Sequence, residues 1–405
     1  MLTYPPEKRI MRRRSTWRNF NKPYVEGHSA YWMISGQEYF KKIVELIDQA
    51  SDEIHLQTYI FIDDKTGRYV GEALLRAVQR NVRVFILIDA FGSDKMSKGY
   101  EKSLEEGGIV IRRFGKFYSR GSFHIGRRLH RKVLVIDGST AVVGGINIAD
   151  YYAGTPQKAA WLDFAIIVNG AICKKIELIC RRRWDEFKFE KNAKKTQKQA
   201  FQFSNLPIRV RRNDFIRNQN EIAITYRQAI RRAKTSLIFV GGYFLPGGRT
   251  RRLLRSAVRR GVEVSVLVAE KSDVGLMVNA RRYLYSWLTE NGIRVFEYRP
   301  ANVHGKVVVV DKKWTSIGSY DLNNLSTYSN IELNIDVNDQ KFSENIAAFI
   351  QNTFDTESTE VTIQSTLLMK TIFSTIKCWL SYQFVKTFFV LSFLLAGKQR
   401  SEEKK

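Results

Sequence analysis

Cysteine, proline and long apolar runs are all scarce in this sequence. Three cysteines and seven prolines occur among 405 residues. The cysteines, Cys173, Cys180 and Cys378, are scattered, so they exclude a disulfide scaffold, show no zinc-binding spacing and fit a reducing compartment. No uninterrupted run of about 18 apolar residues is present, so the sequence predicts no transmembrane helix. The basic N-terminus is not followed by an apolar segment, so we expect no signal peptide.

Negative charge is also in short supply. Lysine and arginine number 66 against 40 aspartate and glutamate residues, which gives a formal net charge of +26. This charge indicates a polyanionic partner, either nucleic acid or an anionic membrane surface, and does not choose between them. Hydrophobic residues make up 44% of the chain and aromatic residues 12%, which excludes wholesale disorder.

Two long segments of the chain read alike. Residues 59–90 and 243–270 each contain an aromatic strand end, a glycine-containing turn, an amphipathic helix and then an apolar strand, at 82–88 and 262–268. Continuous apolar strands that follow helices are typical of βαβ units with parallel, doubly covered strands. The two copies lie about 180 residues apart, which is far too long a period for a solenoid.

The repeat predicts an α/β fold of two homologous domains, each a mixed, mostly parallel sheet flanked by helices. We expect a pseudo-twofold axis between the domains, with the functional site on that axis. The predicted segments are a basic N-terminal arm (1–30), a first domain (31–190), a linker (191–214), a second domain (215–350) and an amphipathic, membrane-associating tail (351–405).

Two of the five histidines occupy matching places in the repeat. Both begin an H-x-K-x₄-D motif that is followed at the same offset by Gly-Gly or Gly-Ser. The first copy contains His130, Lys132, Asp137 and Asn147, and the second contains His304, Lys306, Asp311, Ser319 and Asp321.

The motif spacing has a chemical meaning. A histidine and a lysine two residues apart on a strand point the same way, so two halves brought face to face would place two imidazoles and two ammonium groups in one cleft. That set suits in-line attack on a phosphodiester: one imidazole attacks phosphorus, and the other protonates the leaving alcohol. The lysines, helped by Ser319 and Asn147, would neutralise the oxygens, so we expect neither metal nor cofactor.

The paired motifs resemble those of the phospholipase D superfamily. The segments GGINIADYYAG, WLDF and GSYDLNNLSTYSNIELN, together with YFLPG and FEYRPANVHGKV, are similar to its bacterial cardiolipin synthase branch. The resemblance covers roughly residues 30–340 and is to the short form, which lacks N-terminal membrane helices.

The resemblance implies a phosphatidyltransferase that moves a phosphatidyl group between two phosphatidylglycerols and releases glycerol. It implies that His130 is the nucleophile that forms a phosphohistidine and that His304 is the general acid and base. It also implies that Asp163 and Glu332 each hold the histidine of the other half. The motif aspartates, Asp137 and Asp311, would tie a strand end to neighbouring backbone.

One position departs from the family pattern. The family usually has asparagine where Asp321 stands and often aspartate where Asn323 stands, so the pair is swapped. Asp321 could repel phosphate, or Asn323 or Asn324 could replace the missing donor. The choice of donor and acceptor lipid therefore stays open.

The tail has the pattern of an interfacial amphipathic helix. Between residues 366 and 397, apolar residues recur at helical spacing opposite Lys370, Ser374, Lys377 and Ser381. We expect peripheral or shallow insertion at the cytoplasmic side of a bacterial cell membrane, with anionic phospholipid as the partner. A helix packed on the second domain and a true membrane span are the alternatives.

Three other functions remain open from the sequence. A phospholipase would use water as acceptor, and a nuclease of the same superfamily would use the +26 charge to bind DNA. A non-enzymatic basic scaffold would bind DNA or lipid through charge alone. The leading interpretation, the phosphatidyltransferase, expects no nucleic acid partner. His124 lies in a basic loop and is a candidate for headgroup contact.

Overall fold

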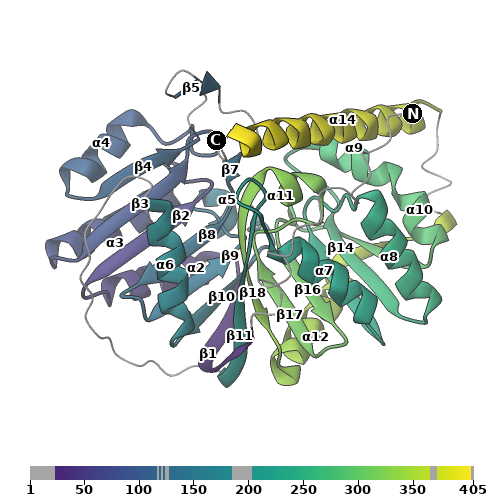
Figure 1. Cartoon of the computed structure of the whole chain (residues 1–405), viewed down its shortest axis with the longest axis horizontal. Helices are drawn as coiled ribbons and strands as arrows, with labels where there is room; N and C mark the ends of the chain where they lie inside the picture. Colours follow the sequence, from purple (N-terminus) through teal and green to yellow (C-terminus); the bar gives the residue numbers. More distant parts are fainter. Residues whose placement is uncertain are drawn as a thin grey trace.

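The computed structural model describes residues 23–115, 118–119, 122–123, 127–184, 203–364 and 372–402. Most of the predicted N-terminal arm, the start of the predicted linker and His124 lie outside these residues. The described chain forms two similar halves that stand side by side (Figure 1).

One mixed sheet runs through both halves. In the first half its strands lie in the order β4 (Val110–Phe114), β3 (Arg83–Asp89), β2 (Glu53–Thr58), β8 (Lys132–Ile136), β9 (Thr140–Gly144), β10 (Phe164–Asn169) and β1 (Val25–Ile34). In the second half the order is β19 (Ser358–Val361), β15 (Ile293–Tyr298), β14 (Glu263–Ala269), β13 (Ser236–Gly241), β16 (Lys306–Val310), β17 (Trp314–Gly318) and β18 (Asn330–Val337). The six strands from β4 to β10 correspond in order to the six strands from β15 to β18, which confirms the predicted duplication.

The parallel strands in each half come from βαβ units. Helix α3 (Lys65–Gln79) connects β2 to β3, and α8 (Gly248–Arg259) connects β13 to β14. Both crossovers correspond to the repeated segments of the sequence. The pairings that continue the sheet from β2 to β10 and from β13 to β18 are antiparallel, so the parallel pairing inside a half joins three neighbouring strands.

The remaining helices cover the sheet or lie at its ends (Figure 1). In the first half they are α2 (Gln37–Asp48), α4 (Lys98–Glu106), α5 (Asp150–Ala153) and α6 (Ile172–Trp184). In the second half they are α7 (Glu221–Arg232), α9 (Gly275–Tyr283), α10 (Tyr285–Glu290), α11 (Asn324–Tyr328), α12 (Gln340–Glu357) and α14 (Ile372–Glu402).

Strand β11 (Phe203–Asp214) joins the halves. It pairs antiparallel with β1 on one side and with β18 on the other. Its alternate residues Leu206, Ile208 and Val210 are buried in a core that includes β10 of the first half and β17 of the second. Because these strands share one core, the two halves are held in a fixed relation.

The structure differs from the predicted boundaries in three places. β1 starts at Val25, inside the predicted arm, and β11 lies inside the predicted linker. Helix α12 and strand β19 extend the second domain to Val361, inside the predicted tail. Each of these segments is fixed by pairing with a distant strand, which local composition does not reveal.

The tail contains one long helix, α14, which packs along α9 and α11 (Figure 1). Val385 and Phe389 are buried against the second half, and the Tyr382 ring lies 4.8 Å from that of Tyr283. Within the described part of the chain, no helix combines the length and apolarity needed to cross a bilayer.

Candidate active site

The motif histidines precede equivalent central strands. His130 lies two residues before the first residue of β8, which is Lys132. His304 and Lys306 have the same relation to β16. The rest of each strand is apolar and buried. The core therefore fixes the strand, and its first residues project histidine and lysine from the same edge of the sheet.

The backbone hydrogen-bonds each histidine segment to the other half. Strand β7 (Arg128–Leu129) pairs in parallel with the start of β18, and the His130 amide donates to the Ile331 carbonyl over 3.0 Å. In the second motif, the His304 amide donates to the Leu162 carbonyl over 2.8 Å. These reciprocal contacts bring the two motifs into one site.

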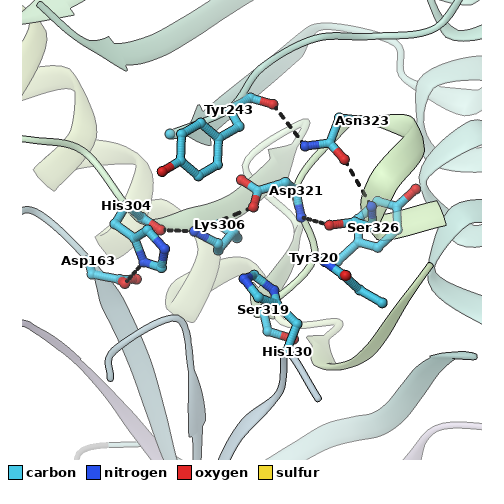
Figure 2. Close-up of polar contacts among 12 residues, drawn as sticks. His130, Asp163, Tyr243, His304, Lys306, Ser319, Tyr320, Asp321, Asn323 and Ser326 are labelled. Carbon is cyan, nitrogen blue, oxygen red and sulfur yellow. Dashed lines mark hydrogen bonds and ion pairs between the residues drawn. The ribbon is translucent and has the colours of Figure 1, made fainter. Parts of the chain in front are cut away.

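A buried carboxylate of the opposite half contacts each imidazole. His130 Nδ1 lies 3.1 Å from both carboxylate oxygens of Glu332, the residue after Ile331. His304 Nδ1 lies 2.6 Å from Asp163 Oδ2, in the residue after Leu162. Figure 2 shows both imidazoles in one close-up, with Lys306 between them in this view. Contact through Nδ1 leaves each Nε2 available for a substrate.

The two lysines extend back along their own motifs. Lys132 Nζ donates to the His130 carbonyl over 2.6 Å, and Lys306 Nζ donates to the His304 carbonyl. Both lysines are buried, and Lys306 Nζ also lies 3.6 Å from Asp321 Oδ2. Burial lowers the pKa of Lys132 to about 7; the charge of Glu332 opposes this shift, and repulsion from Lys306 adds to it.

The two carboxylates differ in their charge state. Burial raises the pKa of Asp163 to about 6, although both lysines oppose the shift. Burial would also raise the pKa of Glu332, but the charge and the hydrogen bond of His130 outweigh it and hold the pKa below its usual value. Burial, with repulsion by the two lysines, lowers the pKa of His304 well below 6.5. Glu332 is therefore a fixed anion, whereas Asp163 titrates near neutrality.

Asn147 and Ser319 lie behind the histidines. Ser319 Oγ donates to Glu332 Oε2 over 2.5 Å, and Asn147 Nδ2 donates to the Tyr152 hydroxyl over 2.7 Å. Both side chains are fully buried. The sequence predicts that they contact phosphate, whereas the structure uses them to orient the groups that hold His130 and His304.

Asp137 and Asp311 directly follow the far ends of β8 and β16, roughly 23 Å along the chain from the histidines. Asp137 accepts from the amides of Ser51, Asp52 and Glu53. Asp311 accepts in the same way from the amides of residues 234, 235 and 236. The shared motif also made both aspartates candidate catalytic residues, but these contacts match their other expected role, which is to tie a strand end to neighbouring backbone.

Asn323 does not replace the amide that the family pattern expects at position 321. Its side-chain oxygen accepts from the Ser326 amide at the start of α11, over 2.9 Å. Its Nδ2 donates to the Tyr243 carbonyl over 3.3 Å (Figure 2). Asn323 is therefore a helix cap, whereas the Asp321 carboxylate lies near Lys306.

The sequence did not predict three tyrosines that lie in the site. The Tyr152 hydroxyl lies 3.2 Å from His304 Nδ1. The ring of Tyr59 lies 5.1 Å from that of His130, and the ring of Tyr243 lies 6.4 Å from that of His304. Tyr59 and Tyr243 begin the two copies of the repeat, and that equivalence was a usable signal. Tyr152 has no counterpart in the second copy, so nothing in the sequence marked it.

The site gathers groups that suit phosphoryl chemistry. In the described ranges, no group of three or more histidine, cysteine or acidic side chains is placed to bind a metal. The site instead holds two imidazoles and two buried lysines. The side chain of His130 is 11% exposed and that of His304 is 8% exposed, so both reach solvent at one edge of the sheet.

Comparison with known proteins assigns the repeat. Residues 43–161 and 226–354 match the family model described as "Cardiolipin synthase, PLD-like domain". Cardiolipin synthase B of Salmonella typhi is 30% identical over 380 residues, which is 90% of this chain and 89% of that protein. Cardiolipin synthase B of Escherichia coli strain K12 is 28% identical over 377 residues, with the same coverage.

Among solved structures, phosphatidylserine synthase of Haemophilus influenzae Rd KW20 superposes with a TM-score of 0.71 at 15% sequence identity. The superposition covers 94% of this chain and 99% of that one. At this identity the likeness concerns the fold alone.

Proposed function

The chain belongs to the cardiolipin synthase family with phospholipase D-like domains, and from this membership we propose that it is a phosphatidyltransferase that makes cardiolipin from two phosphatidylglycerols. Its substrate is a phospholipid. The observation that carries the proposal is the reciprocal pairing of His130 with Glu332 and of His304 with Asp163 across the two halves.

In the first step, His130 Nε2 attacks the phosphorus of one phosphatidylglycerol. A nitrogen–phosphorus bond forms, the bond from phosphorus to the headgroup oxygen breaks, and His304 gives its proton to the departing glycerol. The ionised Glu332 stabilises the positive charge that develops on the His130 ring. Lys132 and Lys306 stabilise the charge on the other phosphoryl oxygens.

In the second step, the headgroup hydroxyl of another phosphatidylglycerol attacks the phosphohistidine. His304, now neutral, takes the hydroxyl proton while the nitrogen–phosphorus bond breaks, which restores both histidines. A phosphodiester anion between the lysines would offset the repulsion that lowers the pKa of His304, so substrate binding itself favours the protonated form needed in the first step.

A direct assay tests the proposed reaction. Purified protein mixed with vesicles containing phosphatidylglycerol labelled in its headgroup should release labelled glycerol and form cardiolipin in equal amounts. Phosphatidic acid as the main product would instead make the enzyme a phospholipase, because water would then be the acceptor. Cleavage of DNA without any lipid product would favour the nuclease alternative.

We also propose that α14 binds the protein to an anionic membrane surface. Its outer face is a stripe of exposed apolar residues, hereafter the α14 stripe: Phe373, Ile376, Trp379, Leu380, Phe384, Phe388, Leu391 and Leu394. The opposite face is packed on the second half, which is what the packed-helix alternative for the tail expects. The α14 stripe is the face that would make the expected interfacial contact. A large exposed apolar patch marks a contact surface, and the +26 charge suits an anionic bilayer.

Alanine in place of Trp379, Phe384 and Phe388 together should lower binding to phosphatidylglycerol-containing vesicles by about 10- to 100-fold, because each ring loses apolar contact. Co-sedimentation with vesicles measures this loss. A matched control changes the exposed Thr375 and Thr387 of the same helix to alanine and should bind normally. Equal binding by both variants would exclude the α14 stripe as the membrane contact.

A further inference from the structure

The two halves of the site differ at one equivalent position. Asn147 and Asp321 each lie three residues after the first glycine of their Gly-Gly or Gly-Ser pair. Both polar atoms of the Asn147 side chain have protein partners: Nδ2 donates to Tyr152, and the oxygen accepts from the Ile60 amide over 3.1 Å and from Thr58 over 3.3 Å.

Asp321 is buried but not satisfied. Only 3% of the residue is exposed, and Oδ2 lies 3.6 Å from Lys306 Nζ, whereas Oδ1 has no hydrogen-bond partner among the residues that the structure describes. A buried acceptor without a donor is costly, and more so when it is charged. The position therefore suits a hydrogen-bond donor that arrives with the substrate.

The surroundings of Asp321 place that donor beside His304. Figure 2 shows the Asp321 carboxylate between Lys306 and the Tyr243 ring, above the His304 and Lys306 pair. The charge of Asp321 acts on both His304 and Tyr243. A second buried acceptor without a partner, Asn302 Oδ1, lies two residues before His304; Asn302 Nδ2 contacts Asp273, which in turn accepts from the Tyr243 hydroxyl. Both unpartnered atoms are acceptors.

A neutral donor fits this site better than a cationic one. Lys306 already lies beside the carboxylate, and Lys132 is close enough to repel the charge of Lys306. A headgroup ammonium would meet that repulsion, whereas a hydroxyl can donate a hydrogen bond to Asp321 Oδ1 without adding charge. Resting on the proposed transferase function, we propose that Asp321 receives a free hydroxyl of a glycerol headgroup and so selects polyols as the alcohol that enters and leaves beside His304.

Competition between two alcohols tests this proposal. The probes are labelled glycerol and 1-propanol at equal concentration, offered to the full-length enzyme with phosphatidylglycerol vesicles. The readouts are labelled phosphatidylglycerol and phosphatidylpropanol. The wild-type enzyme should prefer glycerol by about 10- to 100-fold, the range expected for one hydrogen bond to a charged acceptor. Asp321→Asn should reduce this ratio several-fold, and Asp321→Leu should bring it close to 1.

The controls separate this proposal from the proposed function. Asp355→Asn removes an exposed carboxylate on α12 and should keep the wild-type ratio, although it changes the net charge equally. A wild-type enzyme that uses both alcohols equally overturns the role of Asp321 while leaving the transferase intact. Preference for ethanolamine over glycerol that disappears in Asp321→Asn also overturns it, in favour of an ammonium site.

Loss of transfer to both alcohols in a folded Asp321→Asn enzyme would place Asp321 in the chemical step and overturn a role in selection. Absence of transfer to any alcohol by the wild-type enzyme would contradict the proposed function itself.

Discussion

Alanine in place of His130 should lower the rate of cardiolipin formation by about 10⁴-fold or more, and should prevent attachment of a labelled phosphatidyl group to the protein. The loss is large because His130 is the group that forms the bond to phosphorus in the proposed first step. Lys132 and Lys306 are both turned back onto the carbonyls of their own histidines. Rapid quenching with donor labelled on phosphorus, followed by denaturing electrophoresis, measures the label.

His304→Ala should be equally slow with phosphatidylglycerol but for a different reason. Without the acid, glycerol must leave as an alkoxide, so the first step stalls. A donor whose leaving group is a nitrophenol needs no proton, and with that donor His304→Ala should form the phosphohistidine and accumulate it, because no base then activates the acceptor. The two variants are therefore separated by labelling and not by their rates.

His28→Ala is the matched control for these variants. His28 is a buried histidine of β1 that makes no side-chain hydrogen bond in the described part of the chain. It should retain both turnover and labelling in its folded fraction. If labelling disappeared in His304→Ala and persisted in His130→Ala, the roles of the two histidines would be exchanged. Labelling in both variants would contradict a histidine intermediate.

The sequence predicted the elements of this site because the chain contains two copies of one unit, which can be compared with each other. Two copies of one motif at equivalent places indicate which histidines matter, and the period of two along a strand places each lysine beside its histidine. The βαβ units followed from apolar strands directly after amphipathic helices, at 82–88 and 262–268, and the observed β3 and β14 lie within one residue of them.

The contacts between the halves were not predictable from these patterns. His130 meets Glu332 because a two-residue strand, β7, pairs with the start of β18, and so short a strand has no periodicity of its own. Only the resemblance to a family pointed to Glu332 and Asp163. Tyr152 reaches His304 through the fold of a four-residue helix, α5, and adjacent aromatic residues there read as ordinary core.

Strand β11 illustrates a different limit. Its sequence, FSNLPIRVRRND, mixes apolar alternation with arginine and asparagine and follows a basic connector, so it read as part of the linker. In the structure its polar residues face partners supplied by distant segments: Arg209 contacts Asp336 and Asn213 contacts the carbonyls of residues 326 and 327. Polar residues in a strand are informative only once those partners are known.

The pH dependence of the reaction follows from two buried groups with opposite charge. The pKa of Asp163 is about 6, so acidification through pH 6 protonates the carboxylate that orients His304 and the rate falls. The pKa of Lys132 is about 7, so a rise through pH 7 removes a positive charge from the phosphate site and the rate falls again. We therefore expect a bell-shaped profile of kcat/KM, which reports the free enzyme, with its maximum between about pH 6 and pH 7.

One variant tests each limb of the pH profile. Asp163→Asn should lower kcat/KM by about 10²- to 10⁴-fold and remove the acidic limb, because the amide cannot titrate. Lys132→Arg should move the basic limb upward whatever its overall rate, because a guanidinium stays protonated across this range. Lys174→Arg, at a half-exposed lysine paired with Glu177, is the matched control and should leave both limbs in place.

A Glu332 variant tests whether the acidic limb belongs to Asp163. Its pKa lies below the usual value, so it stays ionised across the measured range and sets neither limb. Glu332→Gln should therefore slow the reaction through His130 while leaving the acidic limb near pH 6. If Glu332→Gln removed that limb and Asp163→Asn kept it, the carboxylate that titrates would be the partner of His130. His130 would then be the acid and base, and the division of roles between the two halves would be reversed.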